Sequence, residues 1–181
     1  MRKIVAGLFV SLDGVVESPD VWTGPYFTPE IGAHIGSMIA AGDTLLLGRV
    51  TYEGFAAAFG GDTSGDPMAA TMNSFPKVVV STTLDKAEWQ NSTLLSGDVA
   101  AEITKLKQQP GKNINISGSA TLVAWLLRQG LLDELDLLVF PVVVGHGKRL
   151  FDTDGDQVAL KLTLSETYDS GVVHLTYQRV S

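Results

Sequence analysis

The feature that most constrains the fold is one order of segments that recurs along most of the chain. A short apolar run is followed by a turn of small or polar residues, and a segment with helical spacing comes next. The apolar runs lie at 3–11, 44–47, 77–81, 113–117 and 135–144. Short apolar runs bounded by turns are typical of strands buried on both faces, as in parallel sheets. The order therefore predicts an α/β fold with helices on both faces of a sheet.

The C-terminal part of the chain follows a different pattern. Leu160, Leu162 and Leu164 alternate with polar residues, and apolar residues alternate again over 173–177. An Asp-Ser-Gly turn at 169–171 separates the two segments. Strict alternation indicates strands with one wet face, and the turn indicates an antiparallel hairpin. We therefore expect one mixed, mostly parallel sheet with flanking helices and a C-terminal antiparallel hairpin.

The first long helix is expected to begin at the Thr-Pro-Glu sequence of 28–30 and to end at Gly42. Gly32, Gly36 and Ala40 recur on one face of this helix. Small residues permit a close approach, so we expect that face to pack on the sheet. Further helices are expected over 50–58, 67–73, 98–107 and 119–129.

Length and composition bound the class of protein. A chain of 181 residues corresponds to a single domain spanning 1–181. The net charge of −7 argues against partners such as nucleic acid or an anionic membrane. The chain has no cysteine, which excludes disulfides and thiolate metal sites. No uncharged apolar run approaches about 18 residues, and the N-terminus lacks a secretory pattern, so a cytoplasmic location is expected.

No metal site is expected from the sequence. His34, His146 and His174 are scattered along the chain without metal-ligand spacing. His34 and His174 are expected to be structural or solvated. The segment with aspartates at 152, 154 and 156 looks like a calcium loop, but its glycine is misplaced and Thr163 stands where such a loop needs glutamate.

Four expected strands end in turns that could bind a ligand. These turns are 11–14, 48–53, 81–84 and 117–121. In open α/β sheets ligands bind beyond the carboxyl ends of the strands, so the four turns would line one crevice. Each turn taken alone is more typical of an ordinary strand-to-helix connection than of a ligand site.

The residues of these turns allow both a functional and a structural interpretation. The segment 118–121 offers small residues and a helix N-terminus to a phosphate, or Ser119 is a plain N-cap. Arg49 can grip a phosphate with two hydrogen bonds, or it pairs with a neighbouring acid. Ser81 and Thr82 can donate hydroxyls to a phosphate, or they simply end a strand. Asp13 can bind a ring amide or relay a proton, or it closes an Asx-turn before a glycine.

In combination the turns resemble a known family. The matching segments are S-x-D-G at 11–14, G-R-x-T-Y-E at 48–53, K-V-V-V-S-T-T-L at 77–84, I-S-G-S-A-T-L at 116–122 and D-E-L-D-L-L-V-F-P-V-V-V-G-x-G-x-x-L-F at 133–151. Their order resembles the reductase domain of the riboflavin-biosynthesis deaminase/reductase, a member of the dihydrofolate reductase-like superfamily. The resemblance spans nearly the whole chain, and it is specific to the superfamily rather than to one substrate.

The resemblance implies the fold and the chemistry. It implies a dihydrofolate reductase-like fold with NADPH across the carboxyl edge of the sheet. It implies hydride transfer to an imine or carbonyl carbon of a small, pyrimidine-like heterocycle. The residues it implies for the cofactor are Gly48, Arg49, Thr51, Ser81, Thr82, Gly118, Ser119, Ala120, Thr121 and Leu122. It places Asp13 as the catalytic residue, and Asp13, Trp22, Phe27, Val144 and Gly145 at the substrate. Pairing of the terminal hairpin in a homodimer is also implied.

The chain departs from the family pattern in three respects. It has Ser117-Gly118 where a di-glycine often precedes the pyrophosphate-binding helix. It lacks the cysteines of the fused zinc deaminase, and its first loop carries Glu17 and Asp20 instead of cations for a phosphoribosyl group. A freestanding relative with another small substrate is therefore expected. The aromatic residues Trp22, Tyr26 and Phe27 form either a lid over a flat ring or a hydrophobic plug under a long loop.

Two other functions stay open at this point. One is dihydrofolate reduction proper, against which the first helix carries no core-facing carboxylate beyond Glu30 near its start. The other is a nucleotide- or ligand-binding protein without turnover.

Overall fold

A computed structural model describes residues 1–61, 65–151 and 155–180. The aspartates at 152 and 154 in the calcium-like segment lie outside the described residues. Within these ranges, no helix combines the length and the apolar character needed to cross a membrane.

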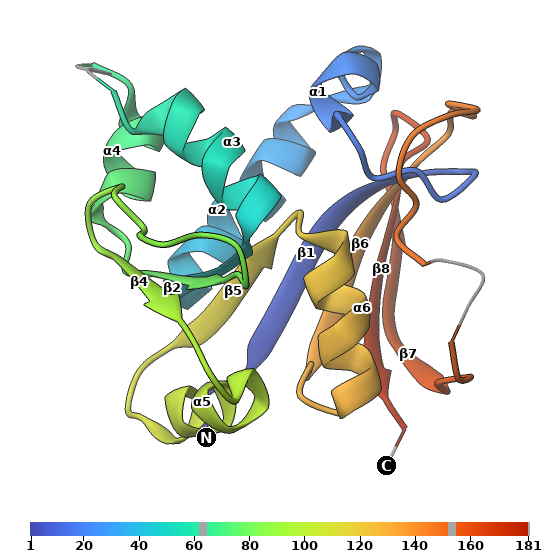
Figure 1. Cartoon of the computed structure of the whole chain (residues 1–181). Coiled ribbons are helices and arrows are strands. Elements are labelled where there is room, and N and C mark those ends of the chain that lie inside the picture. The colour runs from blue at the N-terminus through green and yellow to red at the C-terminus, as the bar shows by residue number, and fades with distance from the viewer. Residues whose placement is uncertain (62–64, 152–154, 181) are drawn as a thin grey trace.

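A single sheet organises the chain (Figure 1). Its strands are β1 (Ile4–Ser11), β2 (Gly42–Gly48), β3 (Lys77–Val80), β4 (Ser92–Leu95), β5 (Asn113–Ser117), β6 (Glu134–Phe140), β7 (Leu160–Thr167) and β8 (Val173–Arg179). Their spatial order is β4-β3-β2-β5-β1-β6-β8-β7. The strands from β4 to β6 pair in parallel, whereas β8 pairs antiparallel with both β6 and β7. The mixed sheet with a C-terminal antiparallel hairpin is therefore confirmed.

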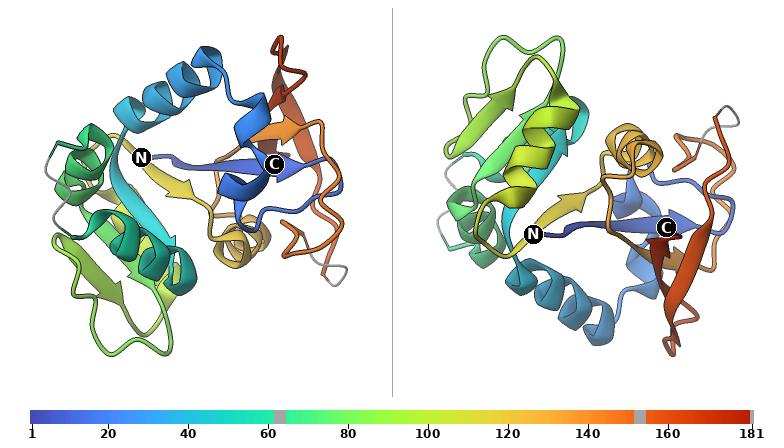
Figure 2. Two further views of the ribbon diagram at one scale, coloured as in Figure 1. Left: turned by 90° about the horizontal axis from the view of Figure 1, so that it is seen from above. Right: turned by 90° about the horizontal axis from the view of Figure 1, so that it is seen from below.

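Helices cover both faces of this sheet, as the strand pattern predicts (Figure 2). The helices are α1 (Pro19–Trp22), the 3-10 helix η1 (Gly24–Tyr26), α2 (Pro29–Ala41), α3 (Arg49–Phe59), α4 (Pro67–Ser74), α5 (Val99–Gln108) and α6 (Ala120–Gln129). Residues of α5 and α6 pack on one face, and residues of α2, α3 and α4 pack on the other. Apolar side chains from neighbouring strand positions therefore enter different cores, which explains why the parallel strands read as continuous apolar runs.

Two expected elements differ in extent from the observed ones. The run 135–144 forms a strand only as far as Phe140, because Pro141 has no N–H for the sheet and the chain turns there. The loop after β1 is not structureless, since it contains α1 and η1. Both differences shape the carboxyl edge of the sheet, where the four candidate turns lie.

The expected packing face of α2 was wrong. Gly32, Gly36 and Ala40 are exposed, and a side-chain carbon built on Gly36 would meet no atom within 4 Å. The helix instead approaches the sheet through the face that carries Met38, whose side chain lies where a Cβ of Gly7 on β1 would be. The close approach is permitted by a glycine of the strand rather than by glycines of the helix.

Candidate functional site

The four candidate turns lie at one edge of the sheet. They follow β1, β2, β3 and β5, which are neighbours in the order β3-β2-β5-β1 and run in parallel. Because parallel strands end at the same edge, the turns stand side by side. The expectation of a shared edge is thus met by the fold.

Two of these turns are joined by hydrogen bonds. The N–H of Gly48 donates to Oγ of Ser119 over 2.9 Å, and the N–H of Ser119 donates to Oγ1 of Thr51 over 2.9 Å. Gly118 has a φ of 68°, and a Cβ at this position would stand 3.2 Å from Oγ1 of Thr51. Glycine is therefore required at 118 both for the left-handed backbone and for the close approach.

These contacts bring the N-termini of α3 and α6 together. Ser119 is the N-cap residue of α6, but its side chain makes no capping hydrogen bond within that helix. Its hydroxyl is engaged by Gly48 instead. The first N–H groups of each helix have no acceptor within the helix and carry the positive end of its dipole. The paired N-termini therefore form a cradle suited to an anion.

Lys148 is a cation at this cradle that sequence reasoning missed. Its Nζ donates a short hydrogen bond to Oγ1 of Thr121 in the first turn of α6. Lys148 lies 27 residues further along the chain, so no local motif links it to that helix. The available signal is the Gly-His-Gly-Lys sequence at 145–148, which puts a lysine directly after a glycine-rich turn.

The other predicted cofactor residues are placed at the same edge. Arg49 is the first residue of α3 and pairs with Glu53 over 2.9 Å, with both side chains exposed. Ser81 accepts hydrogen bonds from the N–H groups of Thr83 and Leu84, so its hydroxyl closes a local turn. Gly48 pairs with Val80, which puts the residues after β2 and β3 next to each other. Their roles in binding stay predictions.

Asp13 links the turn after β1 to the segment after β6 by hydrogen bonds. Its carboxylate accepts the hydroxyl of Ser11 over 2.5 Å and the N–H groups of Val144 and Gly145 over 3.0 and 2.8 Å. The hydrogen bond from Ser11, followed by those from Gly145 and Val144, holds the pKa of Asp13 well below its usual range. A carboxylate so stabilised is a poor proton donor at neutral pH. The predicted catalytic role of Asp13 stays a prediction, and its contacts favour positioning over proton transfer.

The same pair of loops is fastened at two further points. The carboxylate of Glu17 accepts the N–H of Lys148 over 2.6 Å, and Nε of Arg149 donates to the carbonyl of Asp13 over 3.0 Å. Val15 and Arg149 also form an isolated antiparallel bridge. The segment that carries Val144, Gly145 and Lys148 is therefore held against the end of β1.

The aromatic residues of the first loop separate into two groups. Trp22 is buried, packs edge-to-face on Phe140, and donates its indole N–H to the carbonyl of Glu17. Tyr26 also packs on Phe140. These contacts favour the plug over the lid for Trp22 and Tyr26. Phe27 is about half exposed at 49% and is the ring that stays available to a ligand.

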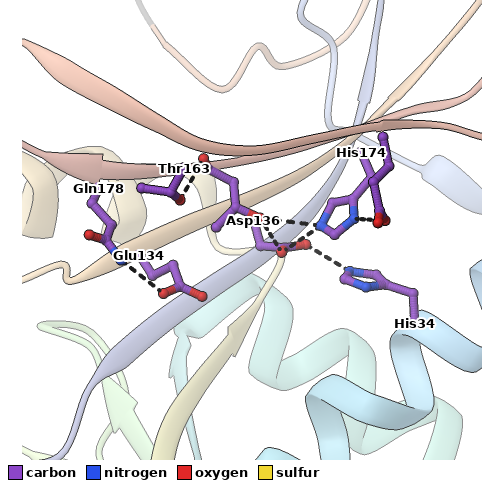
Figure 3. A network of polar contacts seen from close by, with 8 residues as sticks. His34, Glu134, Asp136, Thr163, His174 and Gln178 are labelled. Carbon is purple, nitrogen blue, oxygen red and sulfur yellow. Dashed lines mark hydrogen bonds and ion pairs between the residues drawn. The ribbon is translucent and has the colours of Figure 1, made fainter.

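A second polar cluster was not foreseen. The histidines at 34 and 174 were expected to be scattered, yet both contact Asp136 (Figure 3). His34 comes from α2, Asp136 from β6 and His174 from β8. Burial raises the pKa of Asp136, but the hydrogen bonds from the two histidines outweigh it and the pKa lies below its usual value. No local spacing in the sequence signals this cluster, because its members are brought together only by the sheet and by the placement of α2.

Comparison with known proteins assigns the family and the fold. A model of the RibD C-terminal domain family matches residues 2–174. The uncharacterized protein YyaP of Bacillus subtilis is 30% identical over 182 residues, which covers 97% of this chain and 94% of the relative.

Solved structures give the same fold at low identity. A putative riboflavin biosynthesis protein from Shewanella sp. PV-4 has a TM-score of 0.80 at 21% identity and covers 99% of this chain and 100% of its own. The diaminohydroxyphosphoribosylaminopyrimidine deaminase/5-amino-6-(5-phosphoribosylamino)uracil reductase of Thermotoga maritima has a TM-score of 0.69 at 12% identity, over 99% and 57% of the two chains. Dihydrofolate reductase from Enterococcus faecalis, complexed with NADP(H), has a TM-score of 0.64 at 18% identity, over 99% and 97%. The dihydrofolate reductase-like fold is thereby shown.

Proposed function

The chain belongs to the RibD C-terminal domain family, and from this premise we propose that it is an NADPH-dependent reductase acting on a small heterocyclic imine or carbonyl compound. The observation that carries the proposal is the cradle formed by the N-termini of α3 and α6, with Lys148 beside it. A dinucleotide phosphate is a polyanion, and a protein of net charge −7 does not attract it by its overall field. Groups close to the phosphates must therefore bind it, and the paired helix N-termini of this cradle are such groups.

The residues present fit such a cofactor. Gly118 lets the turn before α6 approach Thr51 of α3, and Ala120 to Leu122 supply N–H groups at the start of α6. We assign the pyrophosphate to this turn and to Lys148. We assign the adenosine phosphates to Arg49 with Ser81 and Thr82. The bound cofactor would supply the hydride, while the chain aligns the substrate and excludes water.

The substrate is proposed to bind between the first loop and the segment 141–147. Phe27 offers an exposed ring for stacking on a flat heterocycle, and Val144 and Gly145 border the space. Asp13 holds these two backbone positions through their N–H groups. Its role in this proposal is to fix the wall of the substrate site. The acidic Glu17 in the same loop disfavours a phosphoribosyl group.

Dihydrofolate reduction proper is not favoured. The core-facing residue at the start of α2 is Ile31, which is fully buried, whereas Glu30 is exposed. The helix therefore presents no carboxylate to the substrate side of the sheet.

We also propose that the protein is a homodimer that pairs through the hairpin of β7 and β8. The strand β7 is an edge strand, and its Leu162 and Leu164 are 47% and 37% exposed. An exposed edge strand with apolar side chains is a site for pairing with another chain.

Titration with NADPH and NADH, followed by cofactor fluorescence, tests the proposal. We expect saturable binding of NADPH, and oxidation at 340 nm in the presence of some members of a panel of pyrimidine imines, pteridines and quinones. Tight binding without oxidation across the panel would favour a ligand-binding protein. No nicotinamide binding at all would overturn both functions.

A further inference from the structure

Three potential metal ligands converge from three separate elements of the fold (Figure 3). Nε2 of His34 lies 2.8 Å from Oδ1 of Asp136, and Nε2 of His174 lies 2.8 Å from Oδ2 of the same carboxylate. One ligand atom from each residue lies within 4.8 Å of the others. The two imidazole rings are 4.1 Å apart between centroids. Two imidazoles and one carboxylate are thus directed at one another in a small volume.

The cluster is enclosed rather than exposed on the surface. The side chains of Asp136 and His174 are 9% and 7% exposed, and that of His34 is 15% exposed. Polar side chains on a protein surface can come together by chance. Burying a carboxylate between two imidazoles costs free energy unless hydrogen bonds or an opposite charge compensate for the lost solvation. His34 is the most exposed of the three side chains.

The surrounding residues resemble the outer shell of a metal site. Oε2 of Glu166 lies 3.5 Å from Nδ1 of His174, on the ring nitrogen that faces away from Asp136. The hydroxyl of Thr176 donates to Oδ2 of Asp136 over 3.2 Å. Histidine ligands usually donate their second N–H to a carboxylate, which fixes the ring and its tautomer. Glu166 is placed to do this for His174.

Charge gives a further reason. The carboxylates of Asp136 and Glu166 both lie next to His174. A dication would compensate both carboxylates in one step.

We propose that His34, Asp136 and His174 bind a divalent transition-metal ion such as Zn²⁺ through Nε2, a carboxylate oxygen and Nε2. Tetrahedral Zn²⁺ with ligands at about 2.0–2.1 Å separates its ligand atoms by about 3.4 Å. The present 2.8 Å contacts would open slightly as the metal binds each Nε2 and the single ring proton of each neutral imidazole moves to Nδ1. His34, with the most exposed of the three side chains, is free to make this adjustment.

The metal site is distinct from the cofactor edge. Asp136 pairs with Gly7 of β1, four residues before Ser11 at the end of that strand. At about 3.3 Å per residue the site lies about 13 Å back from the edge. The ion would tie α2 to β6 and β8. The inference is independent of the proposed reductase activity.

Zn²⁺ titration of chelator-treated, untagged protein tests the site, with calorimetry or a competing chromophoric chelator as readout. We expect one Zn²⁺ per chain, and a higher Tm in its presence. His34→Gln and His174→Gln should abolish this binding, and Glu166→Gln should weaken it about 10- to 100-fold. His146→Gln is the matched control, because His146 is exposed in the 141–147 turn, and it should bind as the unaltered protein does.

A measurement on the unaltered protein guards against a variant that does not fold. In nitrogen-detected NMR, Zn²⁺ should shift the ring Nε2 signals of His34 and His174 and leave those of His146 unchanged. Absence of Zn²⁺ binding, or equal binding by folded His34→Gln, would overturn the proposal and leave the cluster as a hydrogen-bonded tie between α2 and the sheet.

Discussion

The N–H of Ser119 donates to Oγ1 of Thr51 over 2.9 Å, and this contact joins the first turns of α6 and α3. Thr51→Val removes the acceptor while keeping the shape of the side chain. We expect a loss of about 1 kcal/mol, or roughly fivefold weaker NADPH binding, because the two N-termini are no longer held together. Fluorescence titration measures the change. Thr104→Val on α5 removes a comparable hydroxyl far from this edge and should leave the affinity unaltered.

Lys148 and Arg49 are predicted to bind different phosphates of the cofactor. Lys148→Ala should weaken NADPH and NADH alike, by about tenfold, since it removes a charge-assisted contact at the pyrophosphate. Arg49→Ala should weaken NADPH more than NADH, because only NADPH has a 2′-phosphate. Dissociation constants for both cofactors decide between these roles.

Lys105→Ala is the control for this pair, since Lys105 is an exposed lysine of α5 paired with Glu102. An equal loss of affinity for both cofactors in Arg49→Ala would show that Arg49 does not bind the 2′-phosphate. Unchanged affinity in Lys148→Ala would show that Lys148 does not contact the bound cofactor.

Asp13→Asn tests the fastening of the 141–147 segment. An amide has one acceptor oxygen and an NH₂ group that would face the N–H donors of Val144 and Gly145, so the segment should loosen. We expect lower turnover with nearly unchanged NADPH affinity. Asp20→Asn, in an exposed position of the same loop, should change neither quantity.

The pH dependence separates positioning from proton transfer at Asp13. Because its pKa lies below the usual range, Asp13 stays ionised at neutral pH, and stability that it contributes is lost only as the pH falls into the acid region. We therefore expect no limb from Asp13 in the neutral part of the turnover profile. A limb that disappears in Asp13→Asn would instead show proton transfer.

Lys77 is a buried lysine that donates hydrogen bonds to backbone carbonyls at the C-terminal end of α4. Its side chain is almost fully buried, Nζ donates to the carbonyls of Met72 and Phe75 over 2.8 Å, and it lies 4.1 Å from the ring centroid of Trp89. Lys77→Met leaves these carbonyls without their donor. We expect the free energy of unfolding, measured by urea denaturation at pH 7, to fall by about 1–3 kcal/mol. Lys86→Met, at an exposed lysine, should cost much less.

The stability difference at Lys77 should also depend on pH. Burial lowers the pKa of Lys77 to about 8, below the 10.5 of an unperturbed lysine. Between these values the unfolded chain holds the extra proton, so stability rises with pH. The advantage of the unaltered protein over Lys77→Met should therefore grow from about pH 8 to pH 10. A constant difference across this range would contradict the lowered pKa.

The proposed homodimer is tested by light scattering. The unaltered protein should have the mass of two chains, and Leu164→Lys should give the mass of one, because a charge on β7 opposes edge pairing. Met68→Lys, at a similarly exposed position on α4, should remain dimeric. A single-chain mass for the unaltered protein would refute the dimer.

Much of the fold and the position of the candidate site could be predicted from local pattern. Apolar runs bounded by turns mark the parallel strands, and the alternation from Leu160 onward marks the antiparallel hairpin. The turns at 48–53 and 117–121 could be assigned to one edge, since parallel strands end together. What the pattern does not contain is the hydrogen bonding between those turns. Ser119 was interpreted as a possible N-cap of its own helix, whereas its hydroxyl accepts from Gly48.

The sequence by itself determined the order of strands and helices along the chain, the family and the edge at which the candidate turns lie, because these depend on short-range periodicity and motif order. Only the tertiary structure decided which distant side chains meet. Lys148 reaches the start of α6 because its loop is fastened to β1, and His34 and His174 meet on Asp136 because α2 lies against β6 and β8. The residues of these contacts lie far apart in sequence, so their meeting depends on strand register and helix placement, which no local pattern encodes.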